Sequence, residues 1–332
     1  MQDQYGRVID YLRISVTDRC NLRCKYCMPP EGVSLIAHEE LLSLEELFRV
    51  TEIMAGLGIR KVRFTGGEPL VRRNLESLIA RVGQLEHIEQ IGITTNGVLL
   101  EQKLPALLSA GITGVNISLD TLDPEVFRKI TGTDALKQVL SGIYKATEAG
   151  LSVKINCVPC REWNEKEIIR VAGLAAKMPV DIRFIELMPV GCGRQFHGIP
   201  SEEVLLRLSQ KYGKLEPVFG GQAGGLCSGP ARYYESASLM GKIGVISPMS
   251  HKFCRECNRI RLTAEGRLKL CLHYNTGIEL KPLLRAGLCD SEIGRTIREA
   301  VLQKPKAHDF ESLREGGMVP QTDERRMVQI GG

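Results

Sequence analysis

Six cysteines fall into two groups of three, and each group leaves one ligand position of a metal cluster open. The first group has the spacing C-x3-C-x2-C and consists of Cys20, Cys24 and Cys27. The second has the spacing C-x2-C-x13-C and consists of Cys254, Cys257 and Cys271. Thiolates at such spacings ligate cubic iron–sulfur clusters, which contain four irons. Three cysteines leave one iron open, and an open metal position is where a cofactor or a substrate can coordinate.

Spacing alone leaves zinc as an alternative for both groups. The first triplet is compatible with a structural zinc knot or with loose thiols. The second triplet could bind zinc with His251, His273 or Cys289 as the fourth ligand. A zinc-stabilised binding protein without catalysis is therefore one functional class that the cysteines permit.

The residues around the first triplet favour an iron–sulfur cluster. Tyr26 lies between the last two cysteines, and the segment TGGEP at 65–69 follows the strand-like run 61–64. Glycines allow the backbone to approach a ligand closely, and their main-chain N–H groups can bind an amino acid. This pair of motifs resembles the radical S-adenosylmethionine (SAM) enzymes. The resemblance implies that the open iron of the first cluster binds SAM and that reductive cleavage of SAM yields a 5′-deoxyadenosyl radical.

Composition restricts the compartment and the partners. The chain has 332 residues, eleven cysteines and a formal net charge of +5. The absence of a signal peptide and of a long apolar run predicts a cytoplasmic protein that does not enter a membrane. In the reducing cytoplasm, clustered cysteines are metal ligands rather than disulfides. The mild positive charge suits an anionic small molecule and is too weak to indicate nucleic acid.

Short β-rich runs alternate with helical patterns along the first two thirds of the chain. We expect strands near 11–17, 61–65, 90–95, 114–119, 152–158 and 181–187. Helices are expected after the capping-box sequence at Ser43, after Asp123-Pro124, from Asp134 to Gly150, from Asn164 and from Ser201 to Gly213. Alternation of strand and helix predicts a parallel sheet, either open or curved into a barrel that lacks two strands.

Polar residues at the predicted strand ends would converge on one mouth of such a sheet, because active sites of parallel α/β folds gather at the carboxyl ends of strands. Resemblance to radical SAM enzymes favours the barrel. The fold class is therefore α/β, a partial (βα)6 TIM-type barrel whose open side is closed by a smaller C-terminal domain. We expect the barrel over 1–213 and the second domain over 214–332, after a glycine-rich connection at 220–225 and with short strands near 231–236, 242–246, 259–263 and 267–272.

Two arginines directly follow the second cysteine pair. Arg259 and Arg261 alternate along a predicted strand and would therefore point to the same side. Two adjacent guanidinium groups repel each other unless an anion lies between them, and arginine is suited to bidentate phosphate binding. An exposed basic strand edge is the alternative that this pattern leaves open.

The run CRECNRIRLTAEGRLKLCLH at 254–273, together with the first triplet and TGGEP, resembles the GTP 3′,8-cyclase family, also called the molybdenum cofactor biosynthesis protein A family. The resemblance covers nearly the whole chain and implies two [4Fe-4S] clusters, one on each triplet, with the second binding GTP. It assigns SAM binding to the Tyr26 backbone, Gly67, Ser118 and Met188. It assigns GTP contacts to Arg13, Arg63, Thr94, Lys154, Arg259, Ile260 and Arg261. The terminal Gly331 and Gly332 would reach into the active site and act in catalysis.

The activity that this resemblance implies is cyclisation of GTP to (8S)-3′,8-cyclo-7,8-dihydroguanosine 5′-triphosphate, the first step of molybdenum cofactor biosynthesis. The radical abstracts the ribose C3′ hydrogen, and C3′ then attacks C8 of guanine. Implied partners are a downstream cyclic pyranopterin monophosphate synthase and an electron donor, for a monomer or a homodimer. A radical SAM enzyme acting on a peptide is the runner-up, which the clustered arginines disfavour. We treat five further cysteines as incidental: Cys157, Cys160, Cys192, Cys227 and Cys289.

Overall fold

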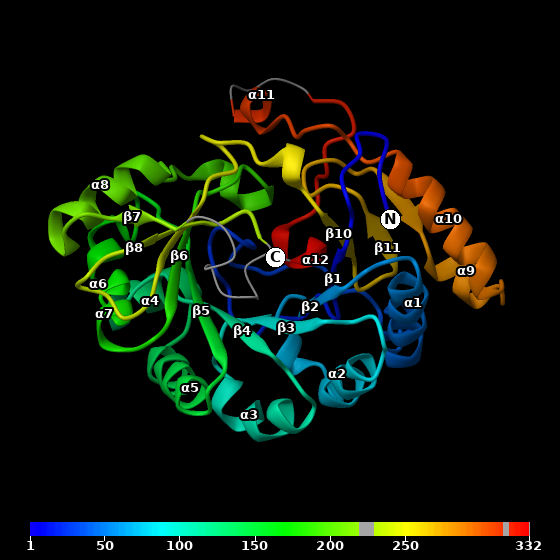
Figure 1. The fold of residues 1–332 in the computed structure, drawn as a ribbon, viewed down its shortest axis with the longest axis horizontal. Helices are drawn as coiled ribbons and strands as arrows, with labels where there is room; N and C mark the ends of the chain where they lie inside the picture. Colours follow the sequence, from blue (N-terminus) through cyan, green and yellow to red (C-terminus); the bar gives the residue numbers. More distant parts are fainter. Residues whose placement is uncertain (219–228, 315–318, 332) are drawn as a thin grey trace.

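The computed structural model describes residues 1–218, 229–314 and 319–331. Within these residues the strands are β1 (Tyr11–Ser15), β2 (Lys61–Thr65), β3 (Gln90–Thr95), β4 (Gly114–Ser118), β5 (Ser152–Cys157), β6 (Asp181–Ile185), β7 (Glu216–Pro217), β8 (Arg232–Glu235), β9 (Ile243–Ile246), β10 (Arg259–Leu262), β11 (Arg267–Lys269) and β12 (Gly277–Glu279). These described strands form one sheet in the order β12-β11-β10-β1-β2-β3-β4-β5-β6-β9-β8-β7. The sheet curves into an incomplete barrel (Figure 1).

The six expected βα units are present. Strands β1 to β6 are neighbours in chain order and run parallel, and their positions confirm the sequence prediction, although four of the predicted ranges end slightly late. The helices on the outer face (Figure 1) are α1 (Leu44–Gly56), α2 (Leu75–Gly83), α3 (Leu100–Ser109), α4 (Pro124–Thr131), α5 (Leu136–Glu148), α6 (Ile168–Ala172), α7 (Leu174–Lys177) and α8 (Ser201–Tyr212). Alternate strand residues such as Ile14, Phe64 and Ile93 are fully buried in one core. The residues next to them in each strand point to the opposite face of the sheet, the inside of the barrel.

Local sequence signals explain where several helices begin. Ser43 and Glu46 form the expected capping box of α1, and the Asp123 side chain accepts bonds from the first-turn N–H groups of α4. The helical segment expected from Asn164 is present, since Asn164 directly precedes the 3-10 turn Glu165–Glu167 that leads into α6, but the Asn164 side chain makes no capping bond. Its side chain instead donates to the carbonyls of Asp120 and Val158, which fixes the loop after β5.

The C-terminal part supplies strands to both edges of the barrel. Strand β9 pairs in parallel with β6, and β10 pairs in parallel with β1, while the outer strands β7, β8, β11 and β12 pair in antiparallel fashion. The segment 247–258 joins β9 to β10 across the open side (Figure 1). The fold is thus a partial TIM-type barrel whose open side is closed by C-terminal elements, as the sequence predicted. The short strands β7 and β12 were not predicted.

The helices described after β12 are α9 (Lys281–Arg285), α10 (Asp290–Leu302), α11 (Phe310–Arg314) and α12 (Met327–Ile330). Helix α10 packs beside α1, and its Ile293, Ile297 and Val301 belong to the same core as the barrel. Helix α12 lies near the centre of the curved sheet, close to the C-terminus (Figure 1). No helix in the described part of the chain is both long and apolar enough to cross a membrane.

Candidate active site

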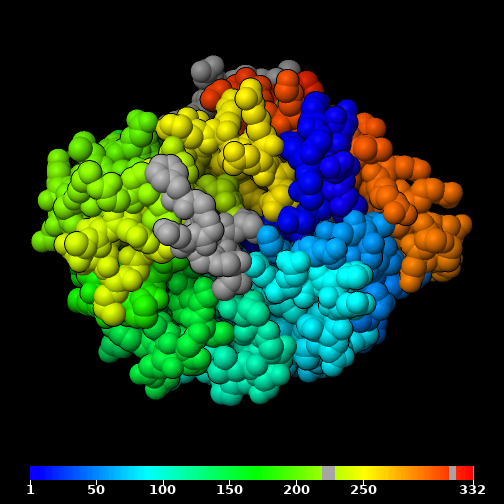
Figure 2. All heavy atoms as spheres, viewed as in Figure 1, coloured from blue at the N-terminus to red at the C-terminus, as the bar shows by residue number. Residues whose placement is uncertain are grey.

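One cavity of about 380 Å³ occupies the centre of the barrel and brings both cysteine groups together. All six ligand candidates line it, together with side chains from β1 to β6 and from β10. The expected site residues that line it are Arg13, Tyr26, Arg63, Gly67, Thr94, Ser118, Lys154, Met188, Arg259 and Arg261. Figure 2 shows the molecule from the same side as Figure 1, with the blue N-terminal segment beside yellow residues of the C-terminal part. The convergence predicted for the strand ends is therefore present.

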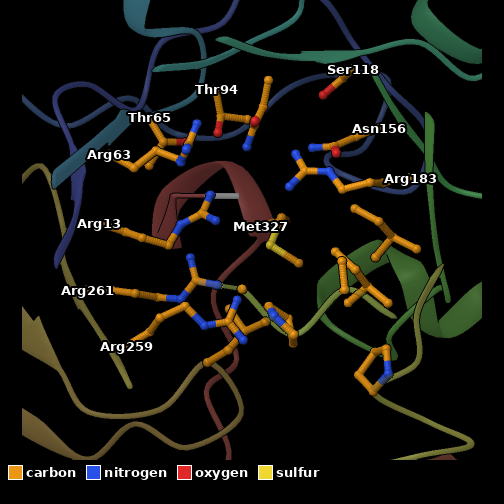
Figure 3. A pocket seen from close by; sticks show the side chains of 18 of the residues that line it. Arg13, Arg63, Thr65, Thr94, Ser118, Asn156, Arg183, Arg259, Arg261 and Met327 are labelled. Carbon is orange, nitrogen blue, oxygen red and sulfur yellow. The ribbon is translucent and has the colours of Figure 1, made fainter. Parts of the chain in front are cut away.

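Three arginines form a row across neighbouring strands. The parallel register places Arg261 of β10 beside Arg13 of β1, and Arg13 beside Arg63 of β2. Figure 3 shows the three guanidinium groups pointing into the cavity, with Arg259 next to Arg261. Arg63 donates from Nε to the Tyr11 hydroxyl at 2.6 Å. We refer to Arg13, Arg63 and Arg261 as the arginine row.

Glycine makes room for the arginine row. Gly92 on β3 is the neighbour of Arg63, and a Cβ added to Gly92 would lie 2.8 Å from the Arg63 guanidinium carbon. Gly244 on β9 stands in the same relation to Arg183 on β6, whose Cγ would lie 2.9 Å from such a Cβ. The missing side chains let both arginines extend along the inner wall of the barrel.

The positive charges of the buried arginines favour binding of an anion in the cavity. Burial and the nearby positive charge of Arg261 hold the pKa of Arg13 well below its usual value. Burial and the positive charge of Arg259 lower the pKa of Arg261 to about 10. Burial alone would raise the pKa of Tyr11, but the positive charges of Arg63 and Arg13 outweigh this effect and lower the pKa to about 8. Among the described lining residues the one carboxylate is Glu186, which already accepts bonds from the backbone around Ser201 and Ser250. An anionic ligand would relieve the repulsion between the guanidinium groups.

The first cysteine group fits a metal cluster. Burial raises the pKa of the Cys24 thiol well above its usual value, and the nearby Cys27, Asp120 and Cys20 raise it further. Burial and Cys20 likewise raise the pKa of Cys27 to about 12. Buried thiols that raise one another's pKa stay neutral unless a cation binds them, so a cationic cluster is the natural partner of this group.

The two glycines of the TGGEP segment serve packing between loops. Gly67 donates from its N–H to the Thr17 carbonyl at 2.7 Å, and a Cβ on Gly66 would lie 2.6 Å from that same oxygen. Glu68 accepts bonds from the Thr95 hydroxyl and from the Asn96 N–H, both at 2.7 Å. The glycines therefore allow the end of β2 to lie against the cysteine loop, and Glu68 ties it to the end of β3.

Tyr26 is held by a buried carboxylate. Its hydroxyl donates to Asp120 Oδ2 at 2.7 Å, and Asp120 Oδ1 accepts from the Val158 N–H. Burial raises the pKa of Asp120 to about 6 and that of Tyr26 well above its usual value. Trp163 packs against Tyr26 with ring centroids 6.3 Å apart. These contacts fix the loop that carries Cys24 and Cys27.

The second cysteine group lies among cations. Burial would raise the pKa of Cys257, but Lys304 and Arg259 outweigh it and lower the pKa to about 7. Lys304 is 2% exposed and lines the cavity. A thiolate is the form that binds iron, so this environment favours cluster ligation. His273 also lines the cavity, whereas Cys289 is exposed at the start of α10.

The C-terminal tail reaches the arginine row. Val328 and Ile330 are 1% exposed, and Ile330 packs in an apolar cluster with Val190 and Phe310, which anchors the tail. The Gly331 carbonyl accepts a bond from Arg261 Nη1 at 2.6 Å. Upstream, the buried carboxylate of Asp323 pairs with Lys269 and Arg325. Gly332 lies outside the described residues.

Two of the remaining predictions need comment. Ile260 is 1% exposed and its side chain packs in the core rather than lining the cavity, so a contact of this residue with GTP stays a prediction. Cys157, Cys160 and Cys192 are buried, and Cys227 lies outside the described residues. The Cys160 Sγ donates to Glu162 at 2.7 Å, which is a local loop contact.

The polar cavity residues that sequence reasoning missed include Tyr11, Arg183 and Lys304. Tyr11 and Arg183 occupy alternate, inward positions of predicted strands, so strand alternation would have identified them. Arg183 Nε and Nη2 are buried and have no hydrogen-bond partner among the described residues. Lys304 follows α10 in a segment with no motif, and nothing in its sequence context indicates its role.

Solved structures share the fold of this chain. The structure titled "Crystal structure of Streptococcus suis SuiB bound to S-adenosylmethionine" aligns with a TM-score of 0.61 at 17% identity, covering 93% of this chain and 74% of that chain. The same protein bound to precursor peptide SuiA gives a TM-score of 0.62 at 16% identity, covering 98% and 76%. Identities this low establish similarity of fold alone.

Sequence comparisons are more specific. The model of the radical SAM superfamily matches residues 14–175, and the model named Molybdenum Cofactor Synthesis C matches 180–310. A protein named GTP 3′,8-cyclase from Clostridium perfringens (strain SM101 / Type A) is 44% identical over 332 residues, and one from Pelotomaculum thermopropionicum is 46% identical over 336 residues. Each alignment covers 100% of both proteins. The chain therefore belongs to the radical SAM superfamily and, within it, to the GTP 3′,8-cyclase family.

Proposed function

We propose that the protein cyclises GTP to (8S)-3′,8-cyclo-7,8-dihydroguanosine 5′-triphosphate, the first step of molybdenum cofactor biosynthesis. The single observation that carries the proposal is the cavity in which two cysteine triplets face one arginine row. Sequence identity of 44% and 46% over the full length of two proteins named GTP 3′,8-cyclase supports the choice of substrate. The same observations disfavour a peptide substrate, which would not require a row of buried guanidinium groups.

The chain would hold three cofactors. Cys20, Cys24 and Cys27 would ligate one [4Fe-4S] cluster, and SAM would bind beside it, between the TGGEP segment and the cavity residues Tyr26, Ser118 and Met188. Cys254, Cys257 and Cys271 would ligate the second. When bound, SAM and the first cluster supply the radical that removes a hydrogen from the substrate ribose, and the open iron of the second cluster supplies a ligand position for guanine.

The protein itself supplies position and charge. In our proposal the arginine row, Arg259 and Lys154 bind the triphosphate, because buried phosphates require charge-assisted hydrogen bonds from several cations. Thr94 lies on the neighbouring strand β3 and offers a hydroxyl to the same cavity. Fixing the triphosphate at one end and the guanine at the other would hold C3′ and C8 in reacting geometry. The buried tail would keep water from this arrangement and complete the site with Gly331 and Gly332.

Several further assignments are part of this proposal. We propose that the barrel unit ends near residue 213 and that the remainder forms the unit carrying the second cluster. We also propose a cytoplasmic location, an external electron donor and delivery of the product to a cyclic pyranopterin monophosphate synthase. Oligomeric state, monomer or homodimer, would be measured by light scattering of the anaerobic protein.

Anaerobic reconstitution tests the function directly. The purified chain would be treated with iron and sulfide, reduced, and assayed for 5′-deoxyadenosine from SAM with each nucleoside triphosphate in turn. We expect GTP to stimulate formation of 5′-deoxyadenosine and to yield the cyclised nucleotide. An Arg261→Ala variant serves as a control that retains both triplets and should lose the response to GTP. Equal stimulation by all four nucleotides, or none by GTP, would refute the proposal.

A further inference from the structure

Arg7 joins three distant parts of the chain behind the second cysteine group. It is 8% exposed, and its guanidinium makes an ion pair with the buried Asp3. Arg7 Nη1 donates to the Cys254 carbonyl at 2.8 Å and to the Lys306 carbonyl at 3.0 Å. Nη2 donates to the Pro305 carbonyl at 2.7 Å. One N-terminal side chain therefore ties the first cysteine of the triplet to the segment after α10.

Lys304 makes the complementary connection from that segment. Its Nζ donates to the Arg259 carbonyl at 2.8 Å and also to the Leu270 carbonyl. Arg259 begins β10, two residues after Cys257, and Leu270 immediately precedes Cys271. Lys304 thus holds the backbone beside the other two cysteines.

Arg7 and Lys304 contact the main chain near different cysteines of the second group. Arg7 contacts the main chain at Cys254, and Lys304 contacts the main chain next to Cys257 and Cys271. Arg7 also donates, at 3.5 Å, to the carbonyl of Lys304 itself, so the two side chains belong to one network. The cysteines come from a loop and from the end of a hairpin, and no regular element holds all three.

We propose that Arg7 and Lys304 are positioning residues that hold the three cysteines in cluster-binding geometry, and that the buried charge of Lys304 stabilises the reduced form of the second cluster. The inference rests on the proposed function for the presence of that cluster. Its electrostatic part follows from proximity, because a buried cation favours the redox state with more negative charge.

The alternative is a purely structural role. The bonds donated by Arg7 and Lys304 would stabilise the packing of these segments in any protein, and their loss would then lower the melting temperature without a specific effect on a metal site. The test must therefore measure the cluster itself. The first cluster would contribute to the same iron and spectroscopic measurements, so it has to be removed. Cys24→Ala removes it and leaves Arg7 and Lys304 unchanged.

The test uses full-length protein in a Cys24→Ala background, reconstituted anaerobically. Lys304→Met removes the charge and the donors at similar length, Lys304→Arg retains the charge, and Arg7→Gln removes the clamp on Cys254. Lys306→Gln is the matched control, since Lys306 is exposed and contributes only its carbonyl to the network. Iron content, the electron paramagnetic resonance signal of the reduced protein and the midpoint potential are measured, with melting temperature alongside.

We expect Lys306→Gln to match the parent. Lys304→Met should bind less iron or retain a cluster whose midpoint potential is more negative, and Lys304→Arg should recover much of either loss. Arg7→Gln should bind at least twofold less iron. If Lys304→Met and Arg7→Gln lower only the melting temperature, with iron content and potential unchanged, the inference is wrong. If the Cys24→Ala parent itself binds no cluster, it is the proposed function that fails, which separates the two outcomes.

Discussion

Replacing Gly92 by Ala should weaken GTP binding indirectly, by displacing the Arg63 side chain that binds the triphosphate in our proposal. The added Cβ would lie 2.8 Å from Cζ, Nη1 and Nη2 of Arg63, which is closer than real contacts allow. The guanidinium would have to move, and it would lose its alignment with the Tyr11 hydroxyl at 2.6 Å and the Ile93 carbonyl at 3.2 Å. A displaced Arg63 could no longer meet a phosphate in the same geometry.

The magnitude follows from one charge-assisted bond. Such a bond contributes about 1.5–3 kcal/mol, so full displacement of Arg63 would weaken GTP binding about ten- to 150-fold. Stability should change little, because Ala is favoured over Gly in a strand by about 0.5–1 kcal/mol and the clashing atoms are the end of a flexible side chain. Calorimetric titration with GTP gives the first quantity, and urea unfolding gives the second.

A double-mutant cycle identifies the cause. If Gly92→Ala acts through Arg63, it should have almost no further effect on GTP affinity in an Arg63→Ala background. Gly56→Ala is the control, because a Cβ there meets nothing within 4 Å. Wild-type GTP affinity in Gly92→Ala, or an undiminished effect in the Arg63→Ala background, would contradict the reasoning.

Three further predictions concern the clusters and the tail. Cys24→Ala should abolish SAM cleavage and leave the spectrum of the second cluster, whereas Cys257→Ala should lose the GTP product while SAM cleavage persists; normal cyclisation by Cys257→Ala would refute the second site. Deleting Gly331 and Gly332 should sharply reduce cyclised product with both clusters retained by iron analysis, and unchanged turnover would make the tail dispensable. Asp323→Asn leaves Lys269 buried with its charge uncompensated and should cost about 3–5 kcal/mol in urea unfolding; a loss below 1 kcal/mol would show that the pair is not structural.

The six barrel strands could be predicted because local sequence determines them. Each is a short β-rich run bounded by turn or cap residues, and the side chains on its outer face bury in one core. The arginine pair on β10 was predictable for the same reason, since alternation places Arg259 and Arg261 on one face. The position of Cys20, Cys24 and Cys27 near the end of a predicted strand placed the first cysteine group at the mouth of the sheet, whereas only the family resemblance placed the second group in the same site.

Other features depend on pairing between distant segments. Nothing local indicates that β10 lies beside β1, so the register that aligns Arg261 with Arg13 could not be derived from sequence. Lys304 and Arg7 are single basic residues outside any motif, and their roles come from carbonyls far away in the chain. The start of the helical segment at Asn164 was predictable, but the bonds of its side chain to the Asp120 and Val158 carbonyls were not, because an asparagine that caps a helix and one that fixes a loop have the same local signature.

The position of the tail links substrate binding to completion of the site. Arg261 donates one bond to the Gly331 carbonyl and has the remaining N–H groups of a planar fork for another acceptor. A phosphate bound by the arginine row and a tail bound by Arg261 would therefore hold the same guanidinium from two sides. Arg13 and Arg63 repel Arg261 until an anion is present, so the anion would also steady the residue that fixes the tail. In our proposal GTP thus strengthens the contact that brings Gly331 and Gly332 to it, which explains physically how a terminal segment without functional side chains can act in catalysis.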